Sequence, residues 1–502
     1  MKSVLASLLS GLALASLFPN WNLKSLAFLA LLPVFYLLEA ESGVRRFLLP
    51  LLSFLLFFLS ILYWIPRVMV LYGGLSWIIS VLLYFLLCAA LALFYVPAIL
   101  GFIFMRRAGV GLACLTFPFG WIACDLIRNF WMVNGFPWGS LGYTQIDLLW
   151  GQIADLGGIY AVTFLIVAVN SLAAWAFVGG ARMRAAAAIV VLLVVSALYG
   201  ARQKEVSYFP SNLIVGAVQP GIELEGSESY LREQYFHRIP VMVRELASRG
   251  ARLVVLPEAP TVFNYYRDQD YAELINNLAA QLRVALIFNN THSDPSGQYY
   301  NSIVFVRADG SSDQRYDKIH LVPFGEYVPG SRWLFFVRPL VREVSSFSAG
   351  SEALVAEQGG VRVGGFICYE AIFPELVRKF SGAGAELLVN ITDDAWYGKT
   401  AAPLQHFQMA RMRAIENRRF LIRCANTGIS AVVDPAGRVK GQLGVFKTGV
   451  LLAGTRPLQQ LTFYVRHGDL FARACAMIFG ASLFILRIYG RRRIDRRTAA
   501  EV

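Results

Sequence analysis

The stretch Gly364-Gly365-Phe366-Ile367-Cys368-Tyr369-Glu370 is an apolar strand that ends in a thiol, with aromatic and acidic neighbours. Two other apolar segments end in charged residues: Val255-Leu256-Pro257-Glu258, and Tyr316-Asp317-Lys318, which is followed by Glu326. A cysteine, a lysine and a glutamate at the ends of predicted strands can form an acyl-transfer site. Because 60 residues separate Glu258 from Lys318, and 50 separate Lys318 from Cys368, only folding can bring them together.

Strand and helix patterns alternate along the region that holds these segments. Apolar runs that predict buried strands lie at 213–219, 252–258, 284–289, 302–307, 364–368, 386–390, 420–424, 429–433 and 448–453. Helical patterns lie between them, at 228–249, 271–282, 372–381 and 404–418. Strands that alternate with helices predict a layered α/β fold with a largely buried sheet. We therefore expect residues 205–465 to form one catalytic domain with a single large core.

The rest of the chain has the composition of a membrane protein. Hydrophobic residues make up 56% of the chain and charged residues 16%, with a mean hydropathy of +0.52. An average soluble protein has about 25% charged residues. Apolar segments that are long enough to cross a bilayer, or nearly so, lie at 3–18, 24–40, 46–65, 75–104, 109–127, 159–178, 183–200 and 468–489. They predict a transmembrane domain of about seven helices at 1–204 and a C-terminal helix with a basic tail at 466–502.

Arginines between the apolar segments set the expected orientation. They cluster after every second segment, at Arg45 and Arg46, Arg106 and Arg107, Arg182 and Arg184, and Arg491 to Arg493 with Arg496 and Arg497. All these clusters fall on the side of the N-terminus, which the positive-inside rule assigns to the cytoplasm. Eight spans would then leave both termini inside and residues 205–465 outside the cytoplasmic membrane. A cleavable signal peptide is the alternative reading of the first segment.

Other features of the sequence exclude several classes of function. The net charge is +13, but the basic residues form no single face or arm, so we do not expect the protein to bind nucleic acid. The six cysteines have no CxxC pair and the five histidines no HExxH pattern, so we expect no metal site. Cys424 is interpreted as a buried thiol, and His406 as a structural residue.

The charged residues and the thiol at the strand ends have complementary chemistry. Cys368 precedes a predicted helix, and helix N-terminal amides and nearby cations favour a thiolate. Glu258 can take the thiol proton and return it to a leaving group. Lys318 can stabilise an oxyanion together with a backbone N–H. Taken singly, such residues are more often a core cysteine, a turn acid and a solvated lysine. Their joint occurrence at strand ends favours catalysis.

These motifs resemble those of the nitrilase superfamily. The match consists of Val255 to Glu258, Tyr316 to Lys318 with Glu326-Tyr327-Val328-Pro329, and Cys368-Tyr369-Glu370. The stretches Asn390 to Gly398 and Gln405 to Ala414 resemble a narrower branch. With the apolar segments, the resemblance is to the bacterial apolipoprotein N-acyltransferases, over essentially the whole chain. One local difference is Gly221, where many relatives carry asparagine.

The resemblance implies a nitrilase-like α-β-β-α sandwich in the periplasm, carried by a multi-pass domain in the bacterial inner membrane. Cys368 would take an acyl chain as a thioester from a phospholipid, with the sn-1 chain of phosphatidylethanolamine as the expected donor. The acceptor would be the α-amino group of the diacylglyceryl-modified N-terminal cysteine of an apolipoprotein, in the last step of lipoprotein maturation. The resemblance implies no metal or organic cofactor, and we expect a monomer.

The resemblance also assigns roles to the residues of the site. Glu258 would be the general base and acid, and Lys318 would stabilise the oxyanion. Glu326 and Glu370 would support the site, and Tyr369 would shape the pocket beside the nucleophile. Three further aromatic residues are divided between core packing and contact with lipid: Trp333, in a segment expected to form a membrane-dipping lid, and Trp396 and Tyr397, which are expected to line the acyl pocket.

Two other functions are compatible with parts of the sequence. A membrane-anchored nitrilase or amidase would use the same three residues and pass the acyl group to water. The eight apolar segments favour lipid substrates, because one anchor would suffice for a hydrolase. A transporter or receptor with an inactive nitrilase-like domain is the second alternative. The few ionisable residues in the apolar segments and the intact Glu-Lys-Cys set weigh against it.

Overall fold

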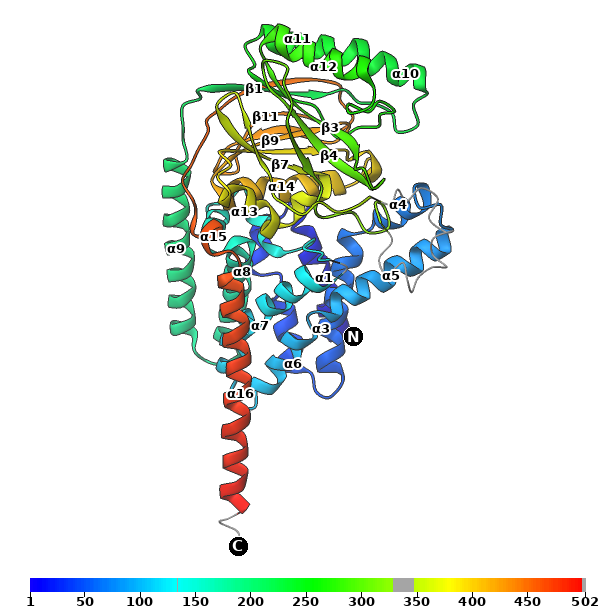
Figure 1. The fold of residues 1–502 in the computed structure, drawn as a ribbon. Helices are drawn as coiled ribbons and strands as arrows, with labels where there is room; N and C mark the ends of the chain where they lie inside the picture. The colour runs from blue at the N-terminus through cyan, green and yellow to red at the C-terminus, as the bar shows by residue number, and fades with distance from the viewer. Residues whose placement is uncertain (133, 328–346, 499–502) are drawn as a thin grey trace. The chain divides into compact units, whose positions relative to one another are not determined.

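The computed structural model describes residues 1–132, 134–327 and 347–498. The chain divides into two compact units (Figure 1). The first, here called the helical unit, comprises Met1–Tyr63, Val81–Ala201 and Gly468–Val502. The second, the layered unit, comprises Trp64–Ser80 and Arg202–His467.

The described part of the layered unit contains two six-stranded sheets that pack face to face. The first sheet has the order β12-β1-β2-β3-β4-β5. Its strands are β1 (Leu213–Gln219), β2 (Leu253–Val255), β3 (Ala285–Ser293), β4 (Tyr299–Val306), β5 (Gln314–Asp317) and β12 (Gly449–Thr455). The second sheet has the order β11-β10-β9-β8-β7-β6. Its strands are β6 (Val355–Gln358), β7 (Val361–Ile367), β8 (Leu387–Thr392), β9 (Phe420–Ala425), β10 (Ser430–Val433) and β11 (Val439–Leu443).

Helices cover the outer face of each sheet (Figure 1). On the first sheet they are α10 (Glu228–Glu233), α11 (Ile239–Ser248) and α12 (Gln269–Leu282), and on the second α13 (Pro374–Gly382) and α14 (Ala402–Asn417). The apolar faces of α11 and α12 pack on the first sheet through Val243, Leu246 and Leu278, all buried. This arrangement is an α-β-β-α sandwich, so the predicted layered α/β fold is confirmed.

One predicted helix differs in its interior. The pattern at 228–249 predicts a single helix, but the structure has α10, a π-helical turn at Gln234–Arg238, and then α11. Pro240 lies in the first turn of α11. Because proline has no N–H to donate to the preceding turn, it interrupts the α-helical ladder at this point.

Strand direction brings the motifs of the sequence to one edge of the sandwich. In the first sheet β1, β2 and β3 are parallel, and β5 has the same direction because two antiparallel pairings separate it from β3. In the second sheet β7, β8 and β9 are parallel. The carboxyl ends of parallel strands share an edge of their sheet, which is where α/β proteins bind ligands. Glu258, Lys318 and Cys368 each follow such an end.

The helical unit contains apolar helices of very different lengths. Its helices are α1 (Lys2–Ser16), α2 (Leu32–Ala40), α3 (Arg45–Ile61), α6 (Val96–Met105), α7 (Val110–Trp131), α8 (Ala154–Val178) and α16 (Leu470–Thr498), with most of α5 (Trp77–Leu93) and of α9 (Arg182–Val206). Within the described residues, five helices are long and apolar enough to cross a membrane: Trp77–Met105, Val110–Trp131, Leu149–Val178, Arg182–Val206 and Leu470–Ile488. A sixth is present if α3 and the bent continuation α4 (Ile65–Leu71) form one span.

These helices account for the last five predicted spans, whereas the first three differ from the prediction. The first, α1, has 15 residues, and the second is broken into a 3-10 turn at Lys24–Phe28 and the nine-residue α2. Pro33 lies in the first turn of α2, where it favours a new helix start over continuation of an earlier helix. The predicted third span, 46–65, ends at Ile61. Eight spans therefore remain a prediction.

Candidate active site

Cys368 lies where β7 gives way to a 3-10 turn at Cys368–Ile372. Its backbone has a φ of 47°, in the left-handed region that a non-glycine residue seldom adopts. The side chain is buried, and burial raises the pKa of the Cys368 thiol well above its usual range, an effect that Glu258 reinforces and Lys318 opposes. The resting thiol is therefore protonated, and it needs a base before it can act as a nucleophile.

Glu258, three residues beyond the end of β2 at Val255, is placed to act as that base. Its carboxylate is hydrogen-bonded to the Cys368 thiol and accepts from Asn301 Nδ2 at 2.9 Å. The other carboxylate oxygen accepts the N–H of Asp393 at 3.2 Å. Burial raises the pKa of Glu258, although Lys318 lowers it. A carboxyl group with a raised pKa is suited to take a proton from the thiol and to give it back.

Lys318 directly follows β5 and is almost completely buried, with an exposed fraction of 1%. Its Nζ lies 2.8 Å from Oε1 of Glu326. Burial opposes the charge of Lys318, but Glu326, Glu258 and Cys368 together raise its pKa. The lysine is therefore charged. A buried ammonium group beside the thiol can stabilise negative charge that develops on an acyl oxygen.

Glu326 and Glu370 hold the Lys318 segment from two sides. Glu326 accepts from Lys318 through Oε1, and Oε2 accepts the N–H of Val322 at 2.8 Å. Glu370 Oε1 accepts from Tyr316 Oη and from two backbone N–H groups that follow Lys318, at 2.7 to 3.0 Å. Its Oε2 accepts the N–H of Ile367 at 2.7 Å. Glu370 thus ties the Lys318 segment to the strand that carries Cys368.

Asn301 is a site residue that the sequence did not single out. Its amide Nδ2 donates to both Glu258 and Glu326, at 2.9 and 3.0 Å. Asn289 donates to the amide oxygen of Asn301 at 2.7 Å and so fixes which way the amide points. The one available signal was a polar residue directly before the apolar run of β4. That signal does not distinguish a site residue from an ordinary strand end.

The structure places the predicted aromatic residues in different surroundings. Tyr369 is buried, with its ring 5.2 Å from that of Phe373. Tyr397 packs edge-on against Trp64 at 5.0 Å, and the thiol of Cys368 is close enough to raise its pKa further beyond the effect of burial. Trp396 is 41% exposed and contacts the ring of Tyr72.

Two consequences follow for the predicted lipid contacts. Trp64 and Tyr72 belong to the layered unit, so both aromatic pairs are internal to it. Trp396 and Tyr397 do not share one environment, because only Trp396 is widely open to solvent. Trp333 lies outside the described residues.

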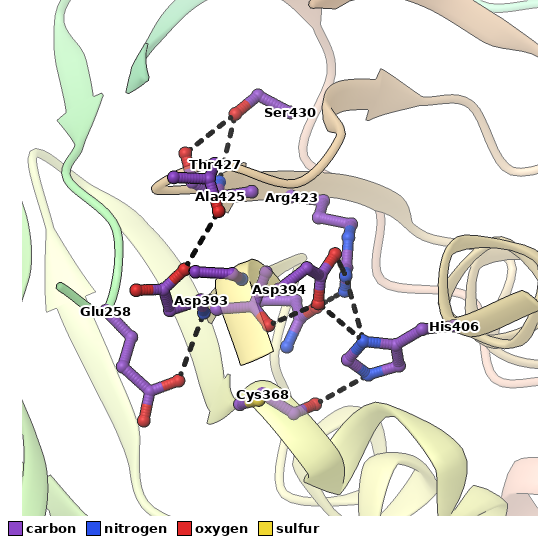
Figure 2. A network of polar contacts seen from close by, with 12 residues as sticks. Glu258, Cys368, Asp393, Asp394, His406, Arg423, Ala425, Thr427 and Ser430 are labelled. Atoms are coloured by element: carbon purple, nitrogen blue, oxygen red, sulfur yellow. Dashed lines mark hydrogen bonds and ion pairs between the residues drawn. The ribbon is translucent and has the colours of Figure 1, made fainter. Parts of the chain in front are cut away.

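A second buried polar network reaches Cys368 from the opposite side to Glu258 (Figure 2). It is formed by Asp394, which follows β8, Arg423 of β9 and His406 of α14. Arg423 pairs with Asp394 at 2.8 Å, and Asp394 lies 2.9 Å from His406 Nδ1. His406, interpreted from the sequence as a structural residue, has polar partners on both ring nitrogens. Its partners come from strands whose proximity the sequence does not indicate.

Comparison with known proteins assigns the chain to a family. The family model "Carbon-nitrogen hydrolase" matches residues 214–462, and "Apolipoprotein N-acyltransferase N-terminal domain" matches residues 10–172. An apolipoprotein N-acyltransferase of Geobacter metallireducens is 36% identical over 98% of this chain and 96% of its own length. The chain belongs to the apolipoprotein N-acyltransferase family. A second member, from Pseudomonas syringae pv. tomato, is 33% identical over 83% of this chain and 84% of its own.

Among solved structures, a branch 10 member of the nitrilase superfamily from Saccharomyces cerevisiae is similar to part of this chain. It covers 49% of this chain and 91% of its own, with 20% sequence identity and a TM-score of 0.40. Family membership itself rests on the sequence matches. These confirm the predicted resemblance, both for the region of the Glu258, Lys318 and Cys368 motifs and for the N-terminal apolar region.

Proposed function

We propose that this protein transfers an acyl chain from a phospholipid to the N-terminal amino group of a diacylated apolipoprotein, through a thioester on Cys368. The observation that carries the proposal is the placement of a protonated, buried thiol between a carboxyl group of raised pKa and a charged lysine, in a chain of this family. The expected donor is the sn-1 chain of phosphatidylethanolamine.

In the first half-reaction, Glu258 takes the proton of the Cys368 thiol, and the sulfur attacks the ester carbonyl of the phospholipid. Lys318 stabilises the oxyanion of the tetrahedral intermediate. When this intermediate collapses, the C–S bond remains and the C–O bond breaks. Glu258 then gives its proton to the glycerol oxygen of the departing lysophospholipid. The acyl chain is left on Cys368 as a thioester.

In the second half-reaction, the α-amino group of the diacylglyceryl-modified cysteine attacks the thioester carbonyl. Glu258 takes a proton from the attacking nitrogen, the C–N bond forms and the C–S bond breaks. The Cys368 sulfur leaves and recovers the proton. Both half-reactions use the same three side chains, so one site can serve two substrates in turn. Because all three belong to one chain, the proposed active species is the monomer.

Intact-protein mass spectrometry tests the first half-reaction. After incubation of the full-length protein with phosphatidylethanolamine vesicles alone, the mass should rise by one acyl chain, and hydroxylamine should remove it. The variant Cys368→Ala should gain no mass. The matched control is Cys424→Ala, which removes a buried thiol that contacts the carbonyls of Val218 and Val255, and it should behave as the wild type does. An acyl adduct on Cys368→Ala, or none on the wild type, would contradict the proposal.

The acceptor separates this function from that of a membrane-anchored hydrolase. With phospholipid and a synthetic diacylated lipopeptide that has a free amino terminus, the products should be a triacylated peptide and a lysophospholipid. Release of free fatty acid at the same rate with and without the lipopeptide would favour the hydrolase. A lipopeptide with a blocked amino terminus is the matched control, and it should accept no acyl chain.

The proposal includes the membrane topology predicted from the arginine clusters: eight spans in the bacterial inner membrane, domains at 1–204, 205–465 and 466–502, and the catalytic domain in the periplasm. Five to six apolar helices support the membrane location. An epitope inserted at the exposed turn of Gly297 should bind antibody on intact spheroplasts. An epitope at the C-terminus should bind only after permeabilisation. Labelling of both epitopes under the same condition would overturn this topology.

A further inference from the structure

The backbone of Cys368 needs a contact that holds it in place. A φ of 47° is unfavourable for a non-glycine residue, and such residues persist only where their surroundings fix them. On the side of β7, the N–H of Ile367 is bonded to Glu370. A contact to the carbonyl group of Cys368 can fix this strained residue on its other side.

That carbonyl oxygen accepts a hydrogen bond from His406 Nε2 at 3.1 Å. A carbonyl oxygen can only accept, so Nε2 carries the proton. The bond joins residues that are 38 positions apart in the chain, and neither atom is exposed to solvent. His406 therefore touches the main chain of the nucleophile.

The imidazole is itself held on its other side. Its Nδ1 lies 2.9 Å from Oδ1 of Asp394 and 3.1 Å from the guanidinium group of Arg423. Arg423 also donates to Oδ2 of Asp394 at 2.8 Å and to the side-chain oxygen of Asn390. The side chains of His406, Asp394 and Arg423 are all completely buried. Asp394 after β8 and Arg423 of β9 thus fix the orientation of the His406 ring that donates to the Cys368 carbonyl (Figure 2).

We propose that His406 is a positioning residue that keeps the nucleophile aimed. Its Nε2–H holds the Cys368 carbonyl, which keeps the backbone left-handed and the thiol directed at Glu258, while Asp394 and Arg423 hold the ring. His406 acts through the main chain and takes no proton from the substrate. The inference rests on the proposed function only for the identity of the acyl donor.

The variant His406→Phe tests this role, because phenylalanine supplies an aromatic ring without either nitrogen. Misplacement of a nucleophile by about 1 Å can cost a hundredfold in rate, so thioester formation should slow by about that factor. The phospholipid concentration that gives half the maximal rate should stay unchanged, since the lipid contacts are intact. The matched control His237→Phe alters an exposed histidine of the layered unit and should keep the wild-type rate. A folded His406→Phe protein with the wild-type rate would overturn the inference.

A second pair of variants decides the question if His406→Phe does not fold. The amide nitrogen of glutamine reaches the place of Nε2, whereas that of asparagine reaches only the place of Nδ1. His406→Gln should therefore form the thioester at least about tenfold faster than His406→Asn, a difference typical of one hydrogen bond. Equal rates in two folded variants, or an asparagine variant that is faster, would refute a role through Nε2.

Alkylation of Cys368 by iodoacetamide separates failure of this inference from failure of the proposed function, because it requires no lipid. The alkylation rate should fall in the order wild type, His406→Gln, His406→Asn. If this order holds but no phospholipid acylates the wild type, the proposed function fails and the positioning role stands. If the wild type is acylated and all the variants alkylate equally, the positioning role fails and the function stands.

Discussion

Two buried polar groups flank Cys368, and they differ in how their charges are balanced. On one side, burial raises the pKa of Glu258, and it raises the pKa of Asp393, which donates its N–H to Glu258, to about 7. On the other side, Asp394 is equally buried, but Arg423 and His406 hold its pKa well below the usual range. The first group therefore holds carboxyl groups of raised pKa, whereas the second holds a carboxylate whose charge is stabilised.

The difference between Asp393 and Asp394 is instructive, because these neighbours follow the same strand. Asp393 accepts from neutral groups, namely the Asn426 amide, the Thr427 hydroxyl and the N–H of Ala395. Asp394 faces a guanidinium group. A paired cation stabilises a buried carboxylate more strongly than a neutral hydrogen-bond donor does. We infer that the Glu258 side, whose charge is unbalanced, takes part in the chemistry. The Asp394 side, whose charge is balanced, holds Cys368 in position.

The largest expected effect is on the rate, from Glu258→Gln. Glutamine keeps the shape of the side chain and its bond to Asn301 but cannot take a proton. Loss of a general base usually costs about 10² to 10⁴ in rate, so thioester formation should fall by about 10³ while the melting temperature changes little. Intact mass spectrometry and thermal unfolding measure the two quantities. The control is Glu273→Gln, on the exposed face of α12. An undiminished rate in Glu258→Gln would contradict the inference that the Glu258 side takes part in the chemistry.

Substitutions on the balanced side should mainly lower the stability of the folded protein. Arg423→Gln leaves Asp394 as a buried carboxylate without its cation, and breaking a buried pair in this way costs about 3 kcal/mol. The melting temperature should therefore drop by several degrees, as measured in detergent solution. Arg249→Gln breaks an ion pair of which both partners are about half exposed, and it should change the melting temperature little. Equal shifts of the melting temperature in the two variants would mean that the buried Arg423 pair contributes no more to stability than the exposed Arg249 pair.

A smaller effect is expected from Asn301→Ala, which acts on the reactive side. Asn301 stabilises the carboxylate form of Glu258, so its loss should raise the pKa of Glu258 further. Thioester formation requires ionised Glu258, and its rate falls as the pH drops through that pKa. The acid limb of the pH–rate profile should therefore move to higher pH, with a loss of about tenfold at the wild-type midpoint. Asn276→Ala, which removes a bond to Tyr265, should leave the limb in place.

The proximity of the residues on the reactive side could be predicted from the sequence for a physical reason. Glu258, Lys318 and Cys368 each follow an apolar strand, and parallel strands bring their carboxyl ends to one edge, so chemistry at strand ends can be inferred from local patterns. Glu326 and Glu370 were also expected near the site, because they belong to the same motifs. The structure brings all five together.

The balanced side could not be predicted in the same way. The contacts of His406, Asp394 and Arg423 depend on how α14 packs over β8 and β9, and no local pattern encodes that packing. Asn301 was missed because an asparagine at a strand end is usually ordinary. The first predicted spans differ for another reason. Hydropathy measures how apolar a segment is, but Pro33 favours a new helix start within the second apolar segment.

The pairing of β1 with β12 has a consequence for biosynthesis. Leu213 lies opposite Thr455, so the first strand of the sandwich pairs with its last. Until more than two hundred further residues have been translated, β1 has an open edge on that side. Contacts of such long range form slowly. The nascent domain must therefore be kept from pairing with other chains, and a ribosome that stalls before residue 449 leaves a sheet that cannot close.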